Sequence, residues 1–322
     1  MQVRPEIAAL RRDPDLSRTI QAGMREAVRT WRARPQVARV IAAMGELTGG
    51  AAVERLPALA ELFGAEPGPS RQFAADFAAA IGAALSDQPL GHVALRHFTN
   101  GRRSTLLLAR TGTVSLTLVA CEAAPVADTA VSVAFPDIET WDRVLAGTAR
   151  AEIVSRPRGD GSGGALSRSP RTLACGDVVV RDGRETALRL TGIDGCLVLL
   201  RLQRRCGAEP TDELRLANGA PVRRTSASAA ESSALLTMTL LRAMDRQDAV
   251  PAITAIARGP GSAPLRWRAA REAIALDTRA GLDTLCEIAA RADDPIAGLA
   301  AALRDDLLAA HSGLADLVSC RA

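Results

Sequence analysis

The spacing of hydrophobic residues changes along the chain and divides it into regions of different structure. In residues 1–88 apolar side chains recur every three or four positions, which predicts helices with one buried stripe. From His92 the spacing becomes two: Val114, Leu116 and Leu118 alternate with polar residues, as expected of a strand with one buried side. We therefore expect a helical region over residues 1–88 and a β-domain over residues 89–206.

Two parts of the β-domain are irregular in pattern. Residues 137–147 fit a short helix that buries Ile138 and Trp141; equally, Trp141 begins an edge strand that runs on to Val154. Residues 155–171 are rich in serine, glycine and arginine, and we expect a loop there.

Beyond the β-domain, residues 207–232 are polar and rich in turn-forming residues, and we expect a linker followed by helices over residues 233–322. Two sets of residues recur in these helices at nearly equal offsets, which indicates a helix–turn–helix unit used twice. Similar residues follow 32 positions after Val250, Ile253, Ile256 and Ala257, and 31 positions after Pro264, Leu265, Ala269, Ala270 and Leu276. The pattern over residues 234–311 resembles HEAT-type helical repeats.

Composition narrows the possible chemistry. All 40 basic residues among the 322 are arginine, and tyrosine is absent. The chain therefore has no lysine for a Schiff base or a phosphate loop, and no tyrosine acid or nucleophile. The six cysteines are scattered, without a CxxC pair or a histidine at zinc-finger spacing, so we expect apolar core residues or free thiols.

The charge pattern does not point to nucleic acid. Although the net charge is +4, the arginines are interspersed with 36 acidic residues, and five Phe and three Trp offer few surfaces for base stacking. No apolar segment has the length of a signal-peptide core or a membrane span. We expect a cytoplasmic protein that has neither a nucleic-acid nor a membrane partner.

The succession of strands and glycine turns resembles the cupin double-stranded β-helix. The resemblance rests on LACGDVVVRDG, residues 173–183, followed by ALRL and CLVLLRL at 187–190 and 196–202. It implies an α+β fold class: a helical N-terminal region, a central cupin-like antiparallel β-barrel or sandwich, and C-terminal α-helical HEAT-like repeats.

The metal motif of the cupin enzymes is not matched. Such enzymes carry a His-x-His pair, a downstream Glu and a later His, which hold a metal from neighbouring strands. Here His92 and His97 are five residues apart, so on a regular strand they lie on opposite sides, and the next histidine is His311. We therefore expect no metal and no cofactor.

Six residues of the β-domain are candidates for ligand binding. They are Arg96, His97, Trp141, Asp177, Arg189 and Arg201. Arg189 and Arg201 lie in apolar strands, where a buried guanidinium needs a paired acid or an anionic ligand, although an exposed face also explains them. Asp177 follows a glycine and equally fits a turn that caps its own backbone, and Trp141 suits a pocket wall or a core anchor.

Together these patterns predict a non-catalytic ligand-binding or regulatory protein. We expect a small-molecule ligand in the β-domain and a protein partner on the C-terminal helices. The alternative is a cupin-type metal-dependent enzyme, an oxygenase or isomerase, with a non-standard site around His97. In that case Glu122, Glu152 or Asp177 joins His97 to hold a single divalent metal ion.

Overall fold

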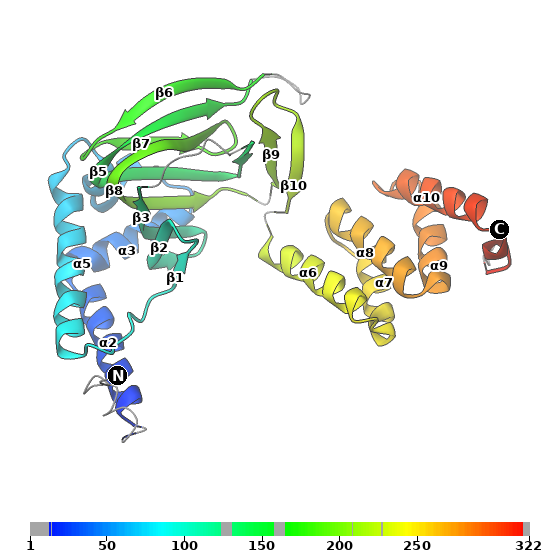
Figure 1. The fold of residues 1–322 in the computed structure, drawn as a ribbon, viewed down its shortest axis with the longest axis horizontal. Helices are drawn as coiled ribbons and strands as arrows, with labels where there is room; N and C mark the ends of the chain where they lie inside the picture. Colours follow the sequence, from blue (N-terminus) through cyan, green and yellow to red (C-terminus); the bar gives the residue numbers. More distant parts are fainter. Residues whose placement is uncertain are drawn as a thin grey trace, which may run out of the picture. The chain divides into compact units, whose positions relative to one another are not determined.

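A computed structural model describes residues 13, 15–123, 131–157, 165–207, 209–226 and 228–317 (Figure 1). The chain divides into two units, Met1–Thr225 and Ser226–Ala322. In the described residues the first unit contains helices and strands, and the second contains helices alone. This is the α+β composition that the sequence predicts.

The N-terminal helices form where the apolar spacing predicts them. They are α2 (Leu16–Arg32), α3 (Pro35–Thr48), η1 (Val53–Arg55), α4 (Pro57–Phe63) and α5 (Gly68–Asp87). The prolines that begin α3 and α4 are tolerated because the first N–H groups of a helix have no partner within it. The buried stripe of α2 ends at Trp31, which packs edge-on against Phe73 and Phe77 of α5, with ring centroids 5.6 and 4.9 Å apart.

Seven strands form one antiparallel sheet in the order β1-β2-β3-β8-β5-β6, and β7 also pairs with β5. Their bounds are β1 (His97–Thr99), β2 (Arg103–Thr111), β3 (Val114–Glu122), β5 (Ile138–Ser155), β6 (Ser167–Leu173), β7 (Val178–Asp182) and β8 (Thr186–Arg205). Leu116 of β3 and Leu202 of β8 share a core with Trp31, so the helices cover this side of the sheet (Figure 1). We call it the helix side and the opposite side the far side.

The two longest strands, β5 and β8, bend the sheet. Three register shifts interrupt their pairing. Gly147 lies in this region with φ +82°, and a Cβ there would lie 2.1 Å from the carbonyl oxygen of Cys196, so only glycine fits. Past the bend, Ala149 and Leu173 share a core with Val119 and Leu199 on the far side. One half of the sheet therefore covers apolar residues of the other.

Of the predicted barrel or sandwich, the closed barrel is not formed, because the sheet is open. Among the described residues its pairing ends at β1 and β6, which do not pair with each other. The predicted strand from His92 is shortened to β1 because Val93 and Leu95 pack on the helical core instead of pairing. Residues 138–147 belong to β5, which is a strand between two neighbours rather than a helix or an edge.

A second, three-stranded sheet occupies part of the expected linker. It has the order β10-β9-β4, with β4 (Ser132–Phe135), β9 (Thr211–Arg215) and β10 (Pro221–Thr225). Phe135 and Leu214 of this sheet share a core with Val154 of β5 and Ala187 of β8. Residues 211–215 and 221–225 of the expected linker are thus strands. The expected loop at 155–171 is likewise reduced, since β6 begins at Ser167 and residues 158–164 lie outside the described residues.

The second unit is built from five α-helices in its described residues. They are α6 (Ala229–Ala243), α7 (Val250–Arg258), α8 (Ala263–Leu276), α9 (Thr278–Ala289) and α10 (Ala297–Ala310), with short turns η2 (Gln247–Ala249) and η3 (Ser312–Leu317). The residues that recur in the sequence fall on α7 and α9, and on α8 and α10, except that Pro295 and Ile296 lie just before α10. The helical content is as predicted; its assignment to HEAT repeats stays a prediction.

Within the residues described, no helix combines the length and the apolar character that crossing a bilayer requires.

Candidate functional site

A buried carboxylate lies between two arginines on the far side of the sheet. Asp142 of β5 stands opposite Arg201 of β8, and Arg181 of β7 stands opposite Thr140, two residues before Asp142 on the same side of the sheet. Arg201 donates to Asp142 from Nε at 2.5 Å and from Nη2 at 3.0 Å, and Nη2 of Arg181 donates at 2.6 Å. The Asp142 side chain is 1% exposed, and those of Arg181 and Arg201 are 12% and 13% exposed.

A third arginine shares this side of the sheet. Arg103 of β2 stands opposite Cys121 of β3, and Thr117, four residues from Cys121 on the same side, stands opposite Arg201. We call Arg103, Arg181, Arg201 and Asp142 the arginine cluster. It contains three guanidinium groups for one carboxylate, and Nε of Arg181 is buried without a hydrogen-bond partner among the described residues.

The pKa values reflect this crowding of positive charge. Burial alone would raise the pKa of Asp142, but the charges and hydrogen bonds of Arg201 and Arg181 outweigh it and lower the pKa. Loss of hydration, and then the charge of Arg201, lower the pKa of Arg103. Asp142 is therefore ionised near neutral pH, while the positive charge around it is only partly compensated.

Arg189 and Asp177, two further candidates, are explained by local partners. Nη2 of Arg189 donates to Glu152 at 3.0 Å, and the two residues stand directly opposite each other in β8 and β5. Oδ2 of Asp177 accepts from the backbone N–H of Ala174 at 2.8 Å, which is the turn-capping role that the sequence left open. Neither residue joins the arginine cluster.

Trp141, a candidate for a pocket wall, lies in the core instead. It is buried on the helix side and packs with the residues around Trp31. Successive strand residues point to opposite sides, so Trp141 and Asp142 face away from each other. The prediction that Trp141 binds ligand is therefore not supported, and the core interpretation holds.

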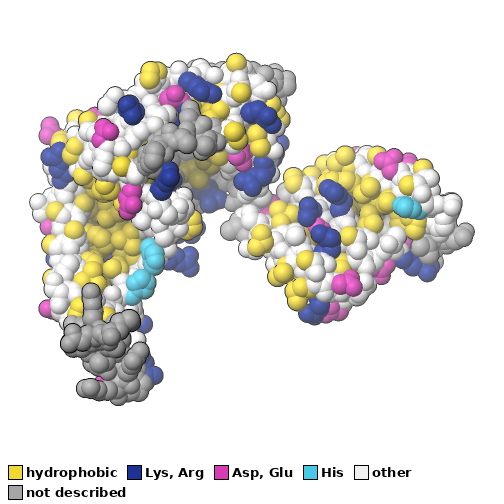
Figure 2. Space-filling model, in the orientation of Figure 1, with side chains coloured by type: hydrophobic (Ala, Val, Ile, Leu, Met, Phe, Trp, Pro, Cys, Tyr) yellow, Lys and Arg dark blue, Asp and Glu magenta, His cyan; other side chains and the backbone are white. Residues whose placement is uncertain are grey.

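Arg96 and His97 are exposed at the edge of the sheet. The His92 and His97 rings lie side by side, with centroids 5.2 Å apart, as the neighbouring histidines in Figure 2 show. The expectation that the two point to opposite sides was wrong, because His92 lies outside any strand and the alternation of a strand does not apply to it. Arg96 lines a pocket beside α2, which is described below.

The residues proposed for a metal site are spread over the sheet. His97 stands opposite Leu106 at one edge, Glu122 opposite Cys196, and Glu152 opposite Arg189 beyond the bend. In the described part of the chain no three His, Cys, Asp or Glu side chains are grouped as metal ligands. The arrangement does not provide the donor set that a cupin-type metal enzyme needs.

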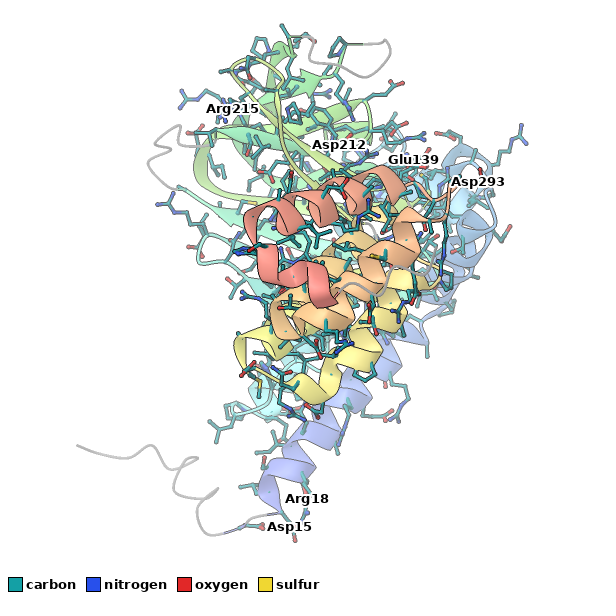
Figure 3. The ribbon with its side chains drawn as sticks, turned by 90° about the vertical axis from the view of Figure 1, so that its right-hand side faces the viewer. Asp15, Arg18, Glu139, Asp212, Arg215 and Asp293 are labelled. Carbon is teal, nitrogen blue, oxygen red and sulfur yellow. The ribbon has the colours of Figure 1, made fainter. Side chains whose placement is uncertain are left out.

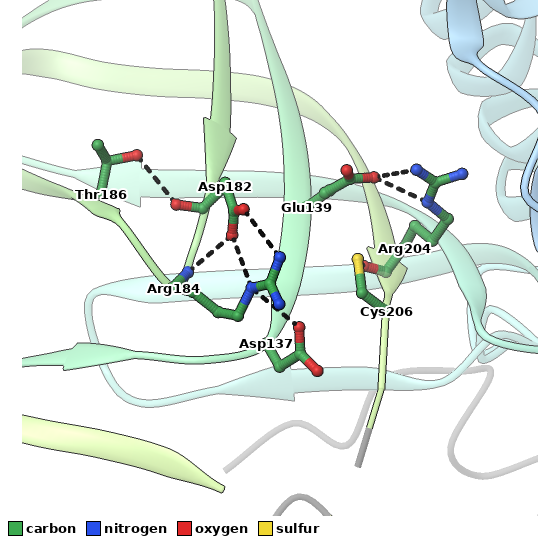
Figure 4. Close-up of polar contacts among 7 residues, drawn as sticks. All are labelled: Asp137, Glu139, Asp182, Arg184, Thr186, Arg204 and Cys206. Atoms are coloured by element: carbon green, nitrogen blue, oxygen red, sulfur yellow. Dashed lines mark hydrogen bonds and ion pairs between the residues drawn. The ribbon is translucent and has the colours of Figure 1, made fainter. Parts of the chain in front are cut away.

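Other arginines join the strands to their surroundings (Figure 4). Arg204 of β8 donates to Glu139 at 2.7 Å and to the backbone carbonyl of Ala51 at 3.0 Å, which links β8 to the helical region. Nε of Arg184 lies 3.4 Å from Asp137. Exposed pairs such as Asp15 with Arg18 at the start of α2 (Figure 3) contribute little, because water screens them.

Comparisons with known proteins give a fold-level similarity only. No protein family model matches the sequence, and no curated protein is significantly similar to it. The chain is similar to the 7S globulin of Momordica charantia, with 13% identity and a TM-score of 0.28 over 38% of this chain and 35% of the globulin. It is similar to KdgF from Halomonas sp., with 13% identity and a TM-score of 0.26 over 35% of this chain and 89% of KdgF.

A third similar structure is a cupin superfamily protein from Desulfitobacterium hafniense, with 15% identity and a TM-score of 0.24 over 34% of this chain and 83% of that protein. The matched region spans about a third of the globulin and about a third of this chain. At these TM-scores the similarity neither assigns the chain to a family nor carries over an activity.

Proposed function

We propose that the protein is a non-catalytic binding protein whose sheet binds a small oxyanion, phosphate or a carboxylate group, at the arginine cluster. One observation carries the proposal: Arg181 and Arg201 share the single carboxylate of Asp142, and Arg103 adds a third positive charge on the same side of the sheet without an ion pair of its own among the described residues. A guanidinium that is removed from water is stabilised by a paired anion, and its planar fork of donors matches carboxylate and phosphate oxygens.

Two further features support a ligand at this place. The buried Nε of Arg181 is a donor without a partner among the described residues, and an oxyanion would supply the acceptor. Arg103 is exposed, so the cluster is open to solvent at β2. The alternative, a metal-dependent enzyme around His97, lacks a grouped set of metal ligands in the described residues.

The test is the stability of the full chain in phosphate or malonate, measured by urea unfolding at constant ionic strength. A ligand that binds the folded protein at 100 times its dissociation constant stabilises it by about 2.7 kcal/mol. We expect such stabilisation in the wild-type chain and its loss in Arg103→Met. The matched control is Arg102→Met, which removes an exposed arginine from the turn before β2.

The control separates the site from general salt effects. Arg102→Met should respond to phosphate as the wild type does, because that side chain is outside the cluster. Equal stabilisation of wild type and Arg103→Met, or an effect no larger than that of chloride, would reject the proposal.

The protein partner predicted for the C-terminal helices stays a prediction. Leu236 and Leu240 of α6 and its C-cap Met244 are exposed at intervals of four residues, so one side of that helix presents apolar side chains to solvent.

A further inference from the structure

A pocket of about 470 Å³ lies between the N-terminal helices and β2. Its apolar lining comes from Ile41 of α3, from Leu95 before β1 and from Leu107 of β2. Its charge comes from three arginines: Arg32 of α2, Arg96, and Arg110 of β2. Its volume is in the usual range for small-molecule sites, roughly 300–1,000 Å³. None of these residues belongs to the arginine cluster.

The charge of this pocket is uniformly positive. No acidic side chain lines it, and among the residues that the structure describes none of its three arginines forms an ion pair with a carboxylate. This differs from Arg181, Arg189 and Arg201 elsewhere in the sheet, each of which meets an acidic residue. The pocket therefore presents unpaired positive charge next to an apolar surface.

An irregularity in the pairing of β2 provides a backbone acceptor for Arg32. Leu107 stands opposite Thr117 and Ala109 opposite Leu116, so Leu108 is the extra residue of a bulge. Nη2 of Arg32 donates to the carbonyl of Leu108 at 2.7 Å. The guanidinium of Arg32 is thus held at the pocket by the backbone, and its other N–H groups are free of acidic partners in the described residues.

We infer that this pocket binds an organic anion in which a carboxylate is attached to an apolar, aromatic or alkyl body. The apolar body would contact Ile41, Leu95 and Leu107, and the carboxylate would face the arginines. A compact inorganic anion would leave the apolar surface exposed, and a neutral apolar molecule would leave the arginines without an acceptor. The chemistry of the lining therefore selects an amphiphilic anion.

The experiment is calorimetric titration of the full chain with 2-naphthoate and with its neutral analogue 2-naphthamide. We expect naphthoate to bind at least about tenfold more tightly, because a hydrogen bond to a charged group contributes about 1.5–3 kcal/mol. Arg96→Met and Arg110→Met should each weaken naphthoate binding by about five- to tenfold, since both side chains are exposed and solvent reduces the effect.

Two controls keep this inference separate from the proposed function. Arg25→Met removes an exposed arginine from α2 outside the pocket, and Arg103→Met removes one from the arginine cluster. Both should bind naphthoate as the wild type does. The inference is wrong if naphthoate and naphthamide bind equally, if neither binds at millimolar concentration, or if Arg96→Met and Arg110→Met keep full affinity.

Discussion

Asp142 and Arg143 are neighbours in β5, yet the buried arginines on the two sides of the sheet have different kinds of hydrogen-bond acceptor. On the far side, Arg181 and Arg201 meet the carboxylate of Asp142. On the helix side, Arg143 is fully buried and meets no carboxylate of the described residues: it donates to the backbone carbonyls of Leu62, Gly64 and Gly176. The comparison shows that one sheet buries guanidinium groups with either charged or neutral acceptors.

The helix side can use neutral acceptors because a helix ends there. Leu62 lies in the last turn of α4 and Gly64 follows it. The last carbonyls of a helix have no partner within the helix and carry the negative end of its dipole. Arg143 satisfies these carbonyls and joins α4 to the sheet. Its donors are occupied, whereas the far side retains uncompensated positive charge.

The largest effect should follow from Asp142→Ala. This change leaves Arg181 and Arg201 buried without their acid, and loss of one partner of a buried ion pair costs about 3–5 kcal/mol. Urea unfolding measures the loss. Added phosphate should restore part of the stability, because an anion can replace the carboxylate. If phosphate does not stabilise this variant, the arginine cluster does not hold uncompensated positive charge.

Arg143→Met should have a smaller effect, about 3 kcal/mol, because the side chain keeps much of its volume while the carbonyls of Leu62, Gly64 and Gly176 lose their donor. Here phosphate should restore nothing, since no charge remains unpaired. Rescue by phosphate in this variant would mean that the two sides of the sheet do not differ as described.

The smallest expected effect is a difference between wild type and Asp142→Ala in how the free energy of unfolding depends on pH. The pKa of Asp142 is lowered in the folded protein, so its contribution is complete above the pKa of an unfolded aspartate, about 3.9, and is lost as the pH falls through the lower folded value. In unfolding measurements from pH 6 downward, the wild type should lose stability more steeply below about pH 4 than Asp142→Ala. Identical slopes would show that Asp142 is not held ionised by its neighbours.

The sequence predicts the helices and most strands because their apolar spacing is local. The spacing that places Trp31 in the core is visible in a single helix, and the alternation from Val114 to Leu118 is visible in a single strand. The shortened β1 could not be predicted in this way, since Val93 and Leu95 have the pattern of a strand but pack on helices distant in sequence.

The arginine cluster shows the same limit for a site. The sequence indicated that a buried Arg201 needs an acid or an anion, and the structure supplies Asp142, which is 59 residues away. Choosing Asp142 from the sequence requires the knowledge that residues 138–155 form a strand next to β8. If residues 137–147 are taken as a strand, Asp142 lies on the side opposite Trp141. This alternation was the one indication in the sequence that Asp142 faces away from the core.

The arginines that join helices to strands also bear on how the first unit folds. Arg143 contacts Leu62 across 81 residues, and Arg204 contacts Ala51 across 153 residues. Contacts so distant in sequence require the closure of long loops, which slows folding. During synthesis the helices leave the ribosome well before Arg204 does. The core that they share with β8 is therefore completed late, after nearly all of this unit has been made.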